Sequence, residues 1–124
     1  MAKKVFVSFD FHNDSGIKTF VMGQAKLSTS PFWGADWSMK EAAPEKSWEE
    51  EAERRIKQCD IVLVMVGKHT YNASGVLKEV DFARKHNVQV AQIIAYSSLV
   101  NPTPVPNAGR LYRWSWPNLK MLLE

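Results

Sequence analysis

The chain has 124 residues and a mass of 14.1 kDa, which leaves room for one domain built around one hydrophobic core. Hydrophobic residues make up 45% and charged residues 23% of the sequence, so the disordered and fibrous classes of protein are excluded. The formal net charge of +3 is too small to indicate a nucleic acid as the partner, and we expect none.

The first third of the chain predicts two strands with a helix between them. Lys4 to Phe9 is mostly β-branched and aromatic and runs into a polar cluster at residues 10–16, which predicts a strand followed by a loop. The segment from Ile17 to Leu27 has the apolar spacing of an amphipathic helix. Beyond the turn residues that follow, the aromatic segment Phe32 to Trp37 predicts a second strand.

The middle of the chain predicts a capped helix and then a buried strand. Ser47 and Glu50 have the spacing of a capping box, so a helix should begin there. Its buried stripe is expected to comprise Trp48, Ala52 and Ile56. The unbroken apolar run from Ile61 to Val66 is typical of a strand at the centre of a sheet, covered on both faces.

The remaining elements are a helix, a strand, a loop, an edge strand and a final helix. The helix face is expected to consist of Val76, Val80, Ala83 and Asn87. Residues 88–94 predict a fourth strand, the three prolines within 101–107 predict a rigid surface loop, and residues 112–114 predict a short edge strand. Ser115 is placed to cap the final helix, which carries Pro117 in its first turn. The apolar anchors of that helix are expected to be Leu119, Leu122 and Leu123.

This alternation of strands and helices predicts an α/β protein. We expect residues 1–124 to form a single three-layer, flavodoxin-like domain with a central parallel sheet of four to five strands. Ligands of such sheets bind beyond the C-terminal ends of the strands. Four segments lie at those ends: residues 8–16, 36–38, 67–74 and 96–98.

The residues in these segments argue against three common uses of the fold. A phosphate-binding loop for nucleoside triphosphates needs Ser or Thr directly after its Lys, but His69 follows Lys68. A phospho-acceptor domain needs an Asp at the end of the third strand, where Gly67 stands. A flavin phosphate needs small residues after the first strand, whereas Phe9 to Asn13 is bulky and acidic.

The histidines and the lone cysteine do not indicate a metal site, and we expect no metal. Among His12, His69 and His86, only His86 has an acid nearby on its predicted helix, Glu79, and seven residues separate the two. His86 is interpreted as a cation near a helix C-terminus, and Cys59 as a small apolar core residue. Without an export signal, a second cysteine or an apolar run near the roughly twenty residues that span a bilayer, we expect a cytoplasmic protein with no membrane partner.

Glu79 is the acidic residue whose expected position best suits a catalytic role. It falls in the opening turns of the helix after the central strand, beside Val76 and Val80, so its carboxylate is expected at the rim of the ligand cleft. A carboxylate there can bind ribose hydroxyls and stabilise positive charge that develops at an anomeric carbon, as in glycosidases. The alternative is a solvated surface acid without a chemical role.

Several segments, in this order and at this spacing, resemble the TIR-like domain family. The segments that carry the resemblance are Val5 to Phe9 with Asp10 and Asp14, Asp36-Trp37-Ser38, Ile61 to Thr70, Val76 to Val80, and Tyr112 to Trp116. The similarity covers nearly the whole chain and is closest to the bacterial and archaeal branch that includes the signal-producing proteins of the Thoeris anti-phage system.

The resemblance implies an NAD-consuming enzyme that cleaves the bond between nicotinamide and ribose and needs no cofactor, because NAD is its substrate. Glu79 matches the family's catalytic glutamate. The residues expected to line the pocket are Ser8, Phe9, Asp10, Asp36 and Ser38. His69 and Tyr71 are candidates to supply aromatic stacking in place of the ring that position 75 lacks. The product would be an ADP-ribose-type or cyclic ADP-ribose-type signal. The expected protein partners are further copies of the chain and a separate effector activated by the product, since 124 residues leave no room for an appended module.

One departure from the family keeps other functions open. Members of this branch commonly have an aromatic residue four positions before the glutamate, where this chain has Gly75. A TIR-like adaptor without catalytic activity is therefore the main alternative, and some of the five tryptophans would then be contact residues. A deoxyribosyltransferase-like enzyme on a related fold is a third hypothesis.

Overall fold

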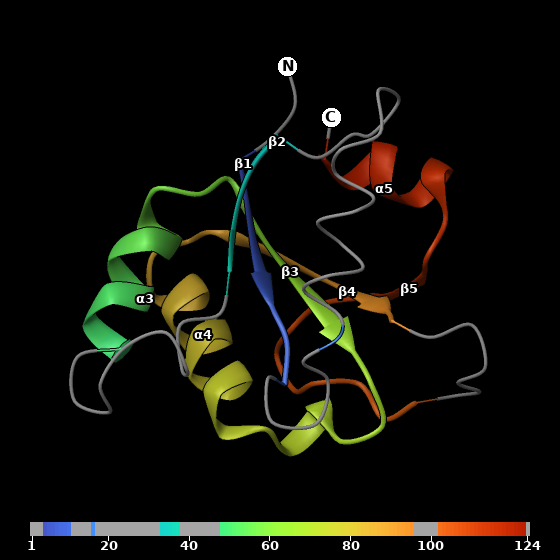
Figure 1. Cartoon of the computed structure of the whole chain (residues 1–124), viewed down its shortest axis with the longest axis horizontal. Helices are drawn as coiled ribbons and strands as arrows, with labels where there is room; N and C mark the ends of the chain where they lie inside the picture. Colours follow the sequence, from blue (N-terminus) through green and yellow to red (C-terminus); the bar gives the residue numbers. More distant parts are fainter. Residues whose placement is uncertain (1–3, 11–15, 17–32, 38–47, 96–101, 124) are drawn as a thin grey trace.

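The computed structural model describes residues 4–10, 16, 33–37, 48–95 and 102–123 (Figure 1). Its strands are β1 (Lys4–Ser8), β2 (Trp33–Trp37), β3 (Ile61–Val66), β4 (Gln89–Ile94) and β5 (Leu111–Arg113). Its helices are α3 (Trp48–Lys57), α4 (Ser74–Lys85) and α5 (Trp116–Leu123), with a short 3₁₀ turn, η1 (Thr70–Asn72). The strands form one sheet in the order β2-β1-β3-β4-β5, and every neighbouring pair is parallel. The predicted α/β architecture is confirmed, with five strands.

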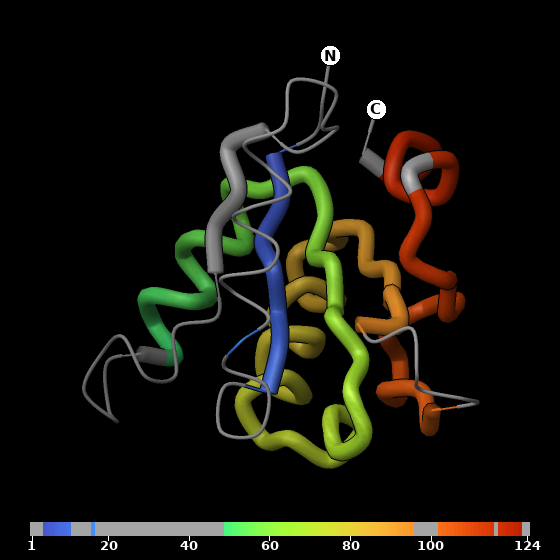
Figure 2. Tube along the Cα trace, turned by 45° about the vertical axis from the view of Figure 1, so that its right-hand side comes forward, coloured from blue at the N-terminus to red at the C-terminus, as the bar shows by residue number. Residues whose placement is uncertain are grey.

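Successive side chains of a strand point to opposite faces of the sheet, so the apolar strands present an apolar surface on each face. Helices cover both of these faces. In Figures 1 and 2, α3 and α4 lie on one side of β1 and β3, and α5 lies on the other. The apolar cluster on the α5 side contains Val5, Val7, Phe9, Ile61, Leu63, Met65, Leu119 and Leu122. The cluster on the α3 and α4 side contains Phe6, Ile56, Val62, Val64, Val66, Val76, Val80 and Ala83. All six residues of β3 are buried, which confirms it as the central strand.

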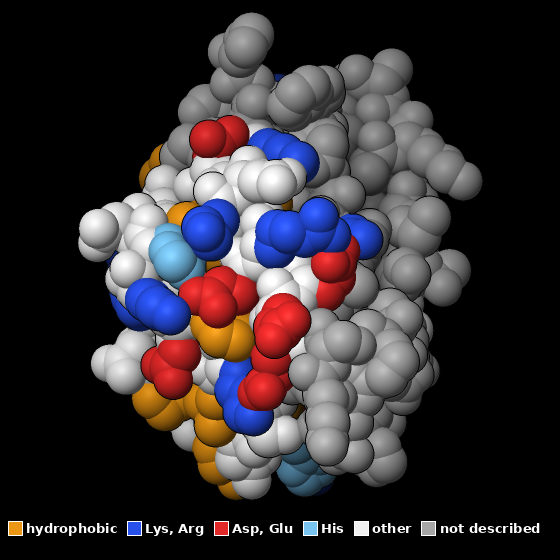
Figure 3. All heavy atoms as spheres, turned by 90° about the vertical axis from the view of Figure 1, so that its left-hand side faces the viewer, with side chains coloured by type: hydrophobic (Ala, Val, Ile, Leu, Met, Phe, Trp, Pro, Cys, Tyr) orange, Lys and Arg blue, Asp and Glu red, His pale blue; other side chains and the backbone are white. Residues whose placement is uncertain are grey.

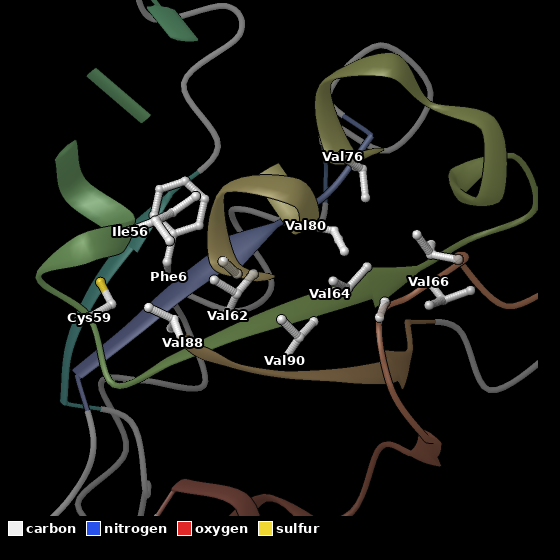
Figure 4. Close-up of a cluster of buried hydrophobic side chains, with 13 residues drawn as sticks. Phe6, Ile56, Cys59, Val62, Val64, Val66, Val76, Val80, Val88 and Val90 are labelled. Atoms are coloured by element: carbon white, nitrogen blue, oxygen red, sulfur yellow. The ribbon is translucent and has the colours of Figure 1, made fainter. Parts of the chain in front are cut away.

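The helix that follows β3 packs directly on that strand. Figure 4 shows Val76 and Val80 of α4 facing Val64 and Val66 of β3. Cys59 lies in the same apolar cluster, as expected for a small core residue. This packing determines which α4 residues face the C-terminal half of β3.

Several expected element boundaries differ from those observed. Asn87 does not belong to the apolar face of α4, because the helix ends at Lys85 and Asn87 is an exposed residue with a φ of 57° that turns the chain into β4. The edge strand spans Leu111–Arg113 rather than residues 112–114, and it does lie at the edge of the sheet. The expected helix at 17–27, together with Phe32 and Ser47, lies outside the described residues.

The expected cap of the last helix is confirmed. The Ser115 hydroxyl accepts a hydrogen bond from the backbone N–H of Asn118 at 3.2 Å, the usual contact of an N-cap residue with the third helical position. Pro117 lies in the first turn, and Leu119 and Leu122 are buried against the sheet. The cap satisfies one of the backbone donors that a helix start leaves unpaired.

Replacing Ser115 by Ala should reduce the free energy of unfolding by about 0.5–2 kcal/mol, because the N–H of Asn118 loses its acceptor. Urea denaturation monitored by circular dichroism measures this change. Ser115→Asp restores a capping oxygen and should keep most of the wild-type stability. Equal loss in both variants would contradict a capping role.

The segment after β4 returns along the sheet and is held by one buried side chain. Gln92 of β4 is 1% exposed. Its amide nitrogen donates to the carbonyls of Val105 and Gly109 at 3.1 and 2.8 Å, and its oxygen accepts from the N–H of Val105 at 2.7 Å. Although Pro102, Pro104 and Pro106 are not buried, Val105 is, so the expected surface loop is anchored to the core through its centre.

The outer faces of α3 and α4 are joined by ion pairs, and Figure 3 shows acidic and basic side chains interspersed on this surface. Glu49 of α3 pairs with Lys78 of α4. Glu53 pairs with Lys85 at 3.1 Å, and its Oε2 lies 2.6 Å from Nε2 of His86. The hydrogen bond with His86, and then that with Lys85, lowers the pKa of Glu53. His86 thus has a specific acidic partner at the C-terminus of α4.

The lowered pKa of Glu53 predicts a pH-dependent contribution to stability. The contribution should be present above the carboxyl's ordinary pKa and be lost as the pH falls through its lower value in the folded protein. The urea midpoint of Glu53→Gln should therefore be slightly below that of wild type at pH 7, and the difference should shrink below about pH 4. A difference that grows on acidification would contradict this assignment.

Among the described residues, no helix has both the length and the apolar character that crossing a bilayer requires.

Candidate functional site

The direction in which successive strands are added to the sheet reverses beside β1. After β1 the chain passes to β2 on one side of it, and the later strands β3 and β4 follow on the other side. In open parallel sheets, ligands bind beyond the C-terminal ends of the two strands that flank such a reversal. The expected ligand position is therefore the C-terminal end of β1 and β3, where Ser8 pairs in register with Val64.

A buried polar contact lies at that position. The Ser8 hydroxyl donates a hydrogen bond to Oε1 of Glu79 at 2.7 Å, between residues 71 positions apart in the sequence. Both residues are 0% exposed. The contact thus joins the end of the first strand to the helix that follows the central strand.

The position of Glu79 follows from the spacing of α4. Val76, Glu79, Val80 and Ala83 are separated by the three- and four-residue steps of one helix face, and all four are buried. Glu79 therefore occupies a core-facing position that an apolar residue would ordinarily fill. The alternative interpretation as a solvated surface acid is wrong, and the carboxylate lies beneath the surface rather than at a rim.

A carboxyl group in such a place is unfavourable for folding unless hydrogen bonds compensate for the lost water. Ser8 supplies one such bond. Strongly desolvated acids near a ligand site are candidates for chemistry because charge interacts more strongly where water is excluded. The arrangement can stabilise a cationic centre brought next to Glu79.

The two residues after Ser8 are placed differently from one another. Phe9 is 2% exposed and belongs to the apolar cluster on the α5 face, so its ring lies across the sheet from Glu79. Asp10 is 7% exposed and lies just beyond the end of β1. The structure therefore places the Phe9 side chain in the core, whereas Asp10 remains at the edge where ligands bind.

The segment after β3 forms a short turn that is closed by a hydrogen bond between Gly67 and Thr70. The N–H of Gly67 donates to the hydroxyl of Thr70 at 2.7 Å, and Thr70 is fully buried. Tyr71 follows in η1 and is 38% exposed. Its role as a stacking partner stays a prediction. Gly75 is buried in the first turn of α4. Because the residue is a glycine, this position provides no aromatic ring.

The second strand is placed by its pairing with β1. Asp36 lies within β2 and pairs in register with Phe6 of β1, so it stands two strand positions before the level of Ser8. Ser38 lies outside the described residues, as does the predicted segment at 96–98. Their roles stay predictions.

Within the described ranges, no group of three or more His, Cys, Asp or Glu side chains is arranged to hold a metal ion. The one His–Glu contact of the site's helix, between His86 and Glu53, is at the opposite end of α4 from Gly75.

The sequence interpretation found both members of the buried pair but not their contact. Ser8 is the polar exception among the buried residues of β1, and Glu79 is the acidic exception on an apolar helix face. Two polar exceptions on buried elements must find hydrogen-bond partners, and this is the signal that links them.

Comparison with models of protein families gives a match. Residues 6–98, more than half of the chain, match the family model described as "Thoeris protein ThsB, TIR-like domain". The matched range includes both Ser8 and Glu79. No curated protein matches the chain.

Proposed function

The chain belongs to the family of TIR-like domains of the Thoeris protein ThsB, and from this premise we propose that it cleaves the bond between nicotinamide and ribose in NAD. The observation that carries the proposal is the fully buried Glu79 carboxyl, which accepts a hydrogen bond from Ser8 at the C-terminal end of β1. NAD is a substrate here, so the proposal needs no cofactor.

The proposed reaction breaks the C1′–N bond of the nicotinamide ribose. The bonding electron pair leaves with nicotinamide and neutralises its pyridinium nitrogen, while positive charge develops on the ribose ring. An ionised Glu79 carboxylate next to that ring stabilises the charge as it forms, and a low-dielectric surrounding strengthens the effect. Water then adds at C1′ and releases a proton, which gives ADP-ribose; an internal nucleophile of the same molecule would give a cyclic product.

Access to Glu79 must change before NAD can react. A carboxyl that is 0% exposed cannot contact a ligand until neighbouring side chains move. We therefore propose that activation, through assembly of several copies or binding of a trigger, opens the site. Asp10 and Tyr71 at the same edge of the sheet are the proposed substrate contacts.

The biological role proposed for this chemistry is a signal in anti-phage defence. A released ADP-ribose-type molecule can diffuse, so a separate effector protein would respond to it. This proposal rests on the Thoeris family membership together with the geometry of Glu79.

The test is incubation of the purified protein with NAD across a range of protein concentrations, with nicotinamide quantified by chromatography and the second product identified by mass spectrometry. The expected result is release of nicotinamide together with an ADP-ribose-type product. Deoxynucleosides offered in parallel should remain intact, and their cleavage would instead support the deoxyribosyltransferase hypothesis.

The adaptor alternative makes an opposite prediction in cells. An adaptor acts through its contacts, so the anti-phage output of an assembled system should survive Glu79→Gln. Loss of that output in Glu79→Gln, at equal protein level, would exclude the adaptor. A buried acid is unfavourable for folding and is of no use to a contact surface, which favours the enzyme.

A further inference from the structure

The role of Ser8 can be inferred from its surroundings. Ser8 is the last residue of β1 and is 0% exposed, so its hydroxyl cannot contact a ligand in this conformation. The alternation of the strand turns Phe6 and Ser8 toward α3 and α4, while Val5 and Val7 face α5. Ser8 therefore lies where an apolar residue would fit the neighbouring cluster.

A hydroxyl in that place needs a partner, because a buried donor without one is unfavourable. The partner is Oε1 of Glu79 at 2.7 Å, a normal length for a hydroxyl donating to a carboxyl oxygen. β1 is held on both sides by β2 and β3, so the donor is fixed by the sheet. The rotatable bonds of Glu79 are thereby restrained by a group that does not move with α4.

We infer that Ser8 is a positioning residue: its hydroxyl holds the carboxyl of Glu79 in the orientation that the reaction requires, and does not itself bind the substrate. The inference rests on the proposed cleavage of NAD. It replaces the expectation that Ser8 is one of the residues in contact with NAD, because the one proton of its hydroxyl is donated to Oε1 of Glu79.

A positioning role has a distinctive kinetic consequence. Without the hydroxyl, the Glu79 carboxyl loses the hydrogen bond that orients its Oε1, and misplacing a reacting group by about 1 Å reduces the rate on the order of 100-fold. Substrate affinity should change little, because no contact with NAD is removed. A residue that bound NAD would instead affect KM.

The test uses a matched pair of variants, Ser8→Thr and Ser8→Val. Their side chains have nearly the same shape, but only Thr keeps the hydroxyl. We expect Ser8→Val to lower kcat by about 10- to 100-fold with KM within about twofold, and Ser8→Thr to recover most of the lost kcat. Ser115→Ala, which removes a hydroxyl from the far layer, is the control for a merely structural effect.

Three kinetic results would overturn the inference. An increase in KM at unchanged kcat would show that Ser8 contacts the substrate. An equally lowered kcat in Ser8→Thr and Ser8→Val would show that side-chain volume matters rather than the hydroxyl. Wild-type kinetics in both variants would show that Ser8 has no role in the reaction.

The two variants' crystal structures provide a test independent of activity: the Glu79 carboxyl should stay in place in Ser8→Thr and move in Ser8→Val. If wild type releases no nicotinamide, the proposed function fails, whereas an unmoved carboxyl in Ser8→Val contradicts the positioning role alone.

Discussion

Replacing Glu79 by Gln should lower the rate of nicotinamide release from NAD by at least about 100-fold while leaving the protein folded. Gln has nearly the same shape and keeps an oxygen that can accept the Ser8 hydroxyl, so the buried hydrogen bond survives. What it loses is the negative charge that would stabilise the developing cation on the ribose. The measurement is the initial rate of nicotinamide release, together with the thermal midpoint of each protein.

The thermal midpoint separates a chemical from a structural effect. A fully buried carboxylate is less favourable than a neutral amide of the same size, so Glu79→Gln should unfold at the same temperature as wild type or higher. Asp81→Asn is the matched control, because it makes the same acid-to-amide change at an exposed position of the same helix. It should keep the wild-type rate. An equal rate in Glu79→Gln would contradict the catalytic assignment.

Replacing Gln92 by Leu should lower the free energy of unfolding by about 3 kcal/mol or more. The change leaves the N–H and carbonyl of Val105 and the carbonyl of Gly109 without their side-chain partner. Each unpaired buried backbone group is unfavourable by about 1–3 kcal/mol, so the segment after β4 should detach or be strained. Urea denaturation measures the loss, and proteolysis within residues 102–109 reports detachment.

Two variants define which groups of Gln92 matter. Gln92→Glu keeps an acceptor for Val105 but removes the donors and directs a carboxyl at two carbonyls, so it should be as unstable as Gln92→Leu at pH 7. Gln89→Ala changes an exposed residue at the start of the same strand and should have a small effect. Wild-type stability in Gln92→Leu would show that the three hydrogen bonds do not hold this segment.

The sequence predicted most of the fold correctly where a single physical pattern dominates. The apolar run of β3, the helix face of Val76, Val80 and Ala83, and the cap at Ser115 each follow from local rules, and the structure confirms them. Asn87 was misassigned because its position continues the helical spacing, although Asn also adopts the left-handed conformation that ends a helix.

The candidate site was predicted less completely because it depends on contacts between distant segments. The pairing of Ser8 with Glu79 follows from the register of β1 with β3 and the packing of α4, which no local pattern specifies. The burial of Gln92 was hidden for a similar reason: its polar side chain is satisfied by backbone groups more than ten residues away. Phe9 was expected at the pocket because of the resemblance to the TIR-like family, but its side chain belongs to the apolar cluster on the α5 face.

The measurement that tests the central claim most directly is a single-turnover reaction with the purified protein in excess over NAD. Wild type and Glu79→Gln are compared at equal folded fraction, and nicotinamide and the ADP-ribose-type product are quantified over time. We expect wild type to convert the bound NAD into equal amounts of the two products, and Glu79→Gln to leave it almost intact. Conversion at the same rate by both proteins would contradict the account, as would intact NAD with wild type.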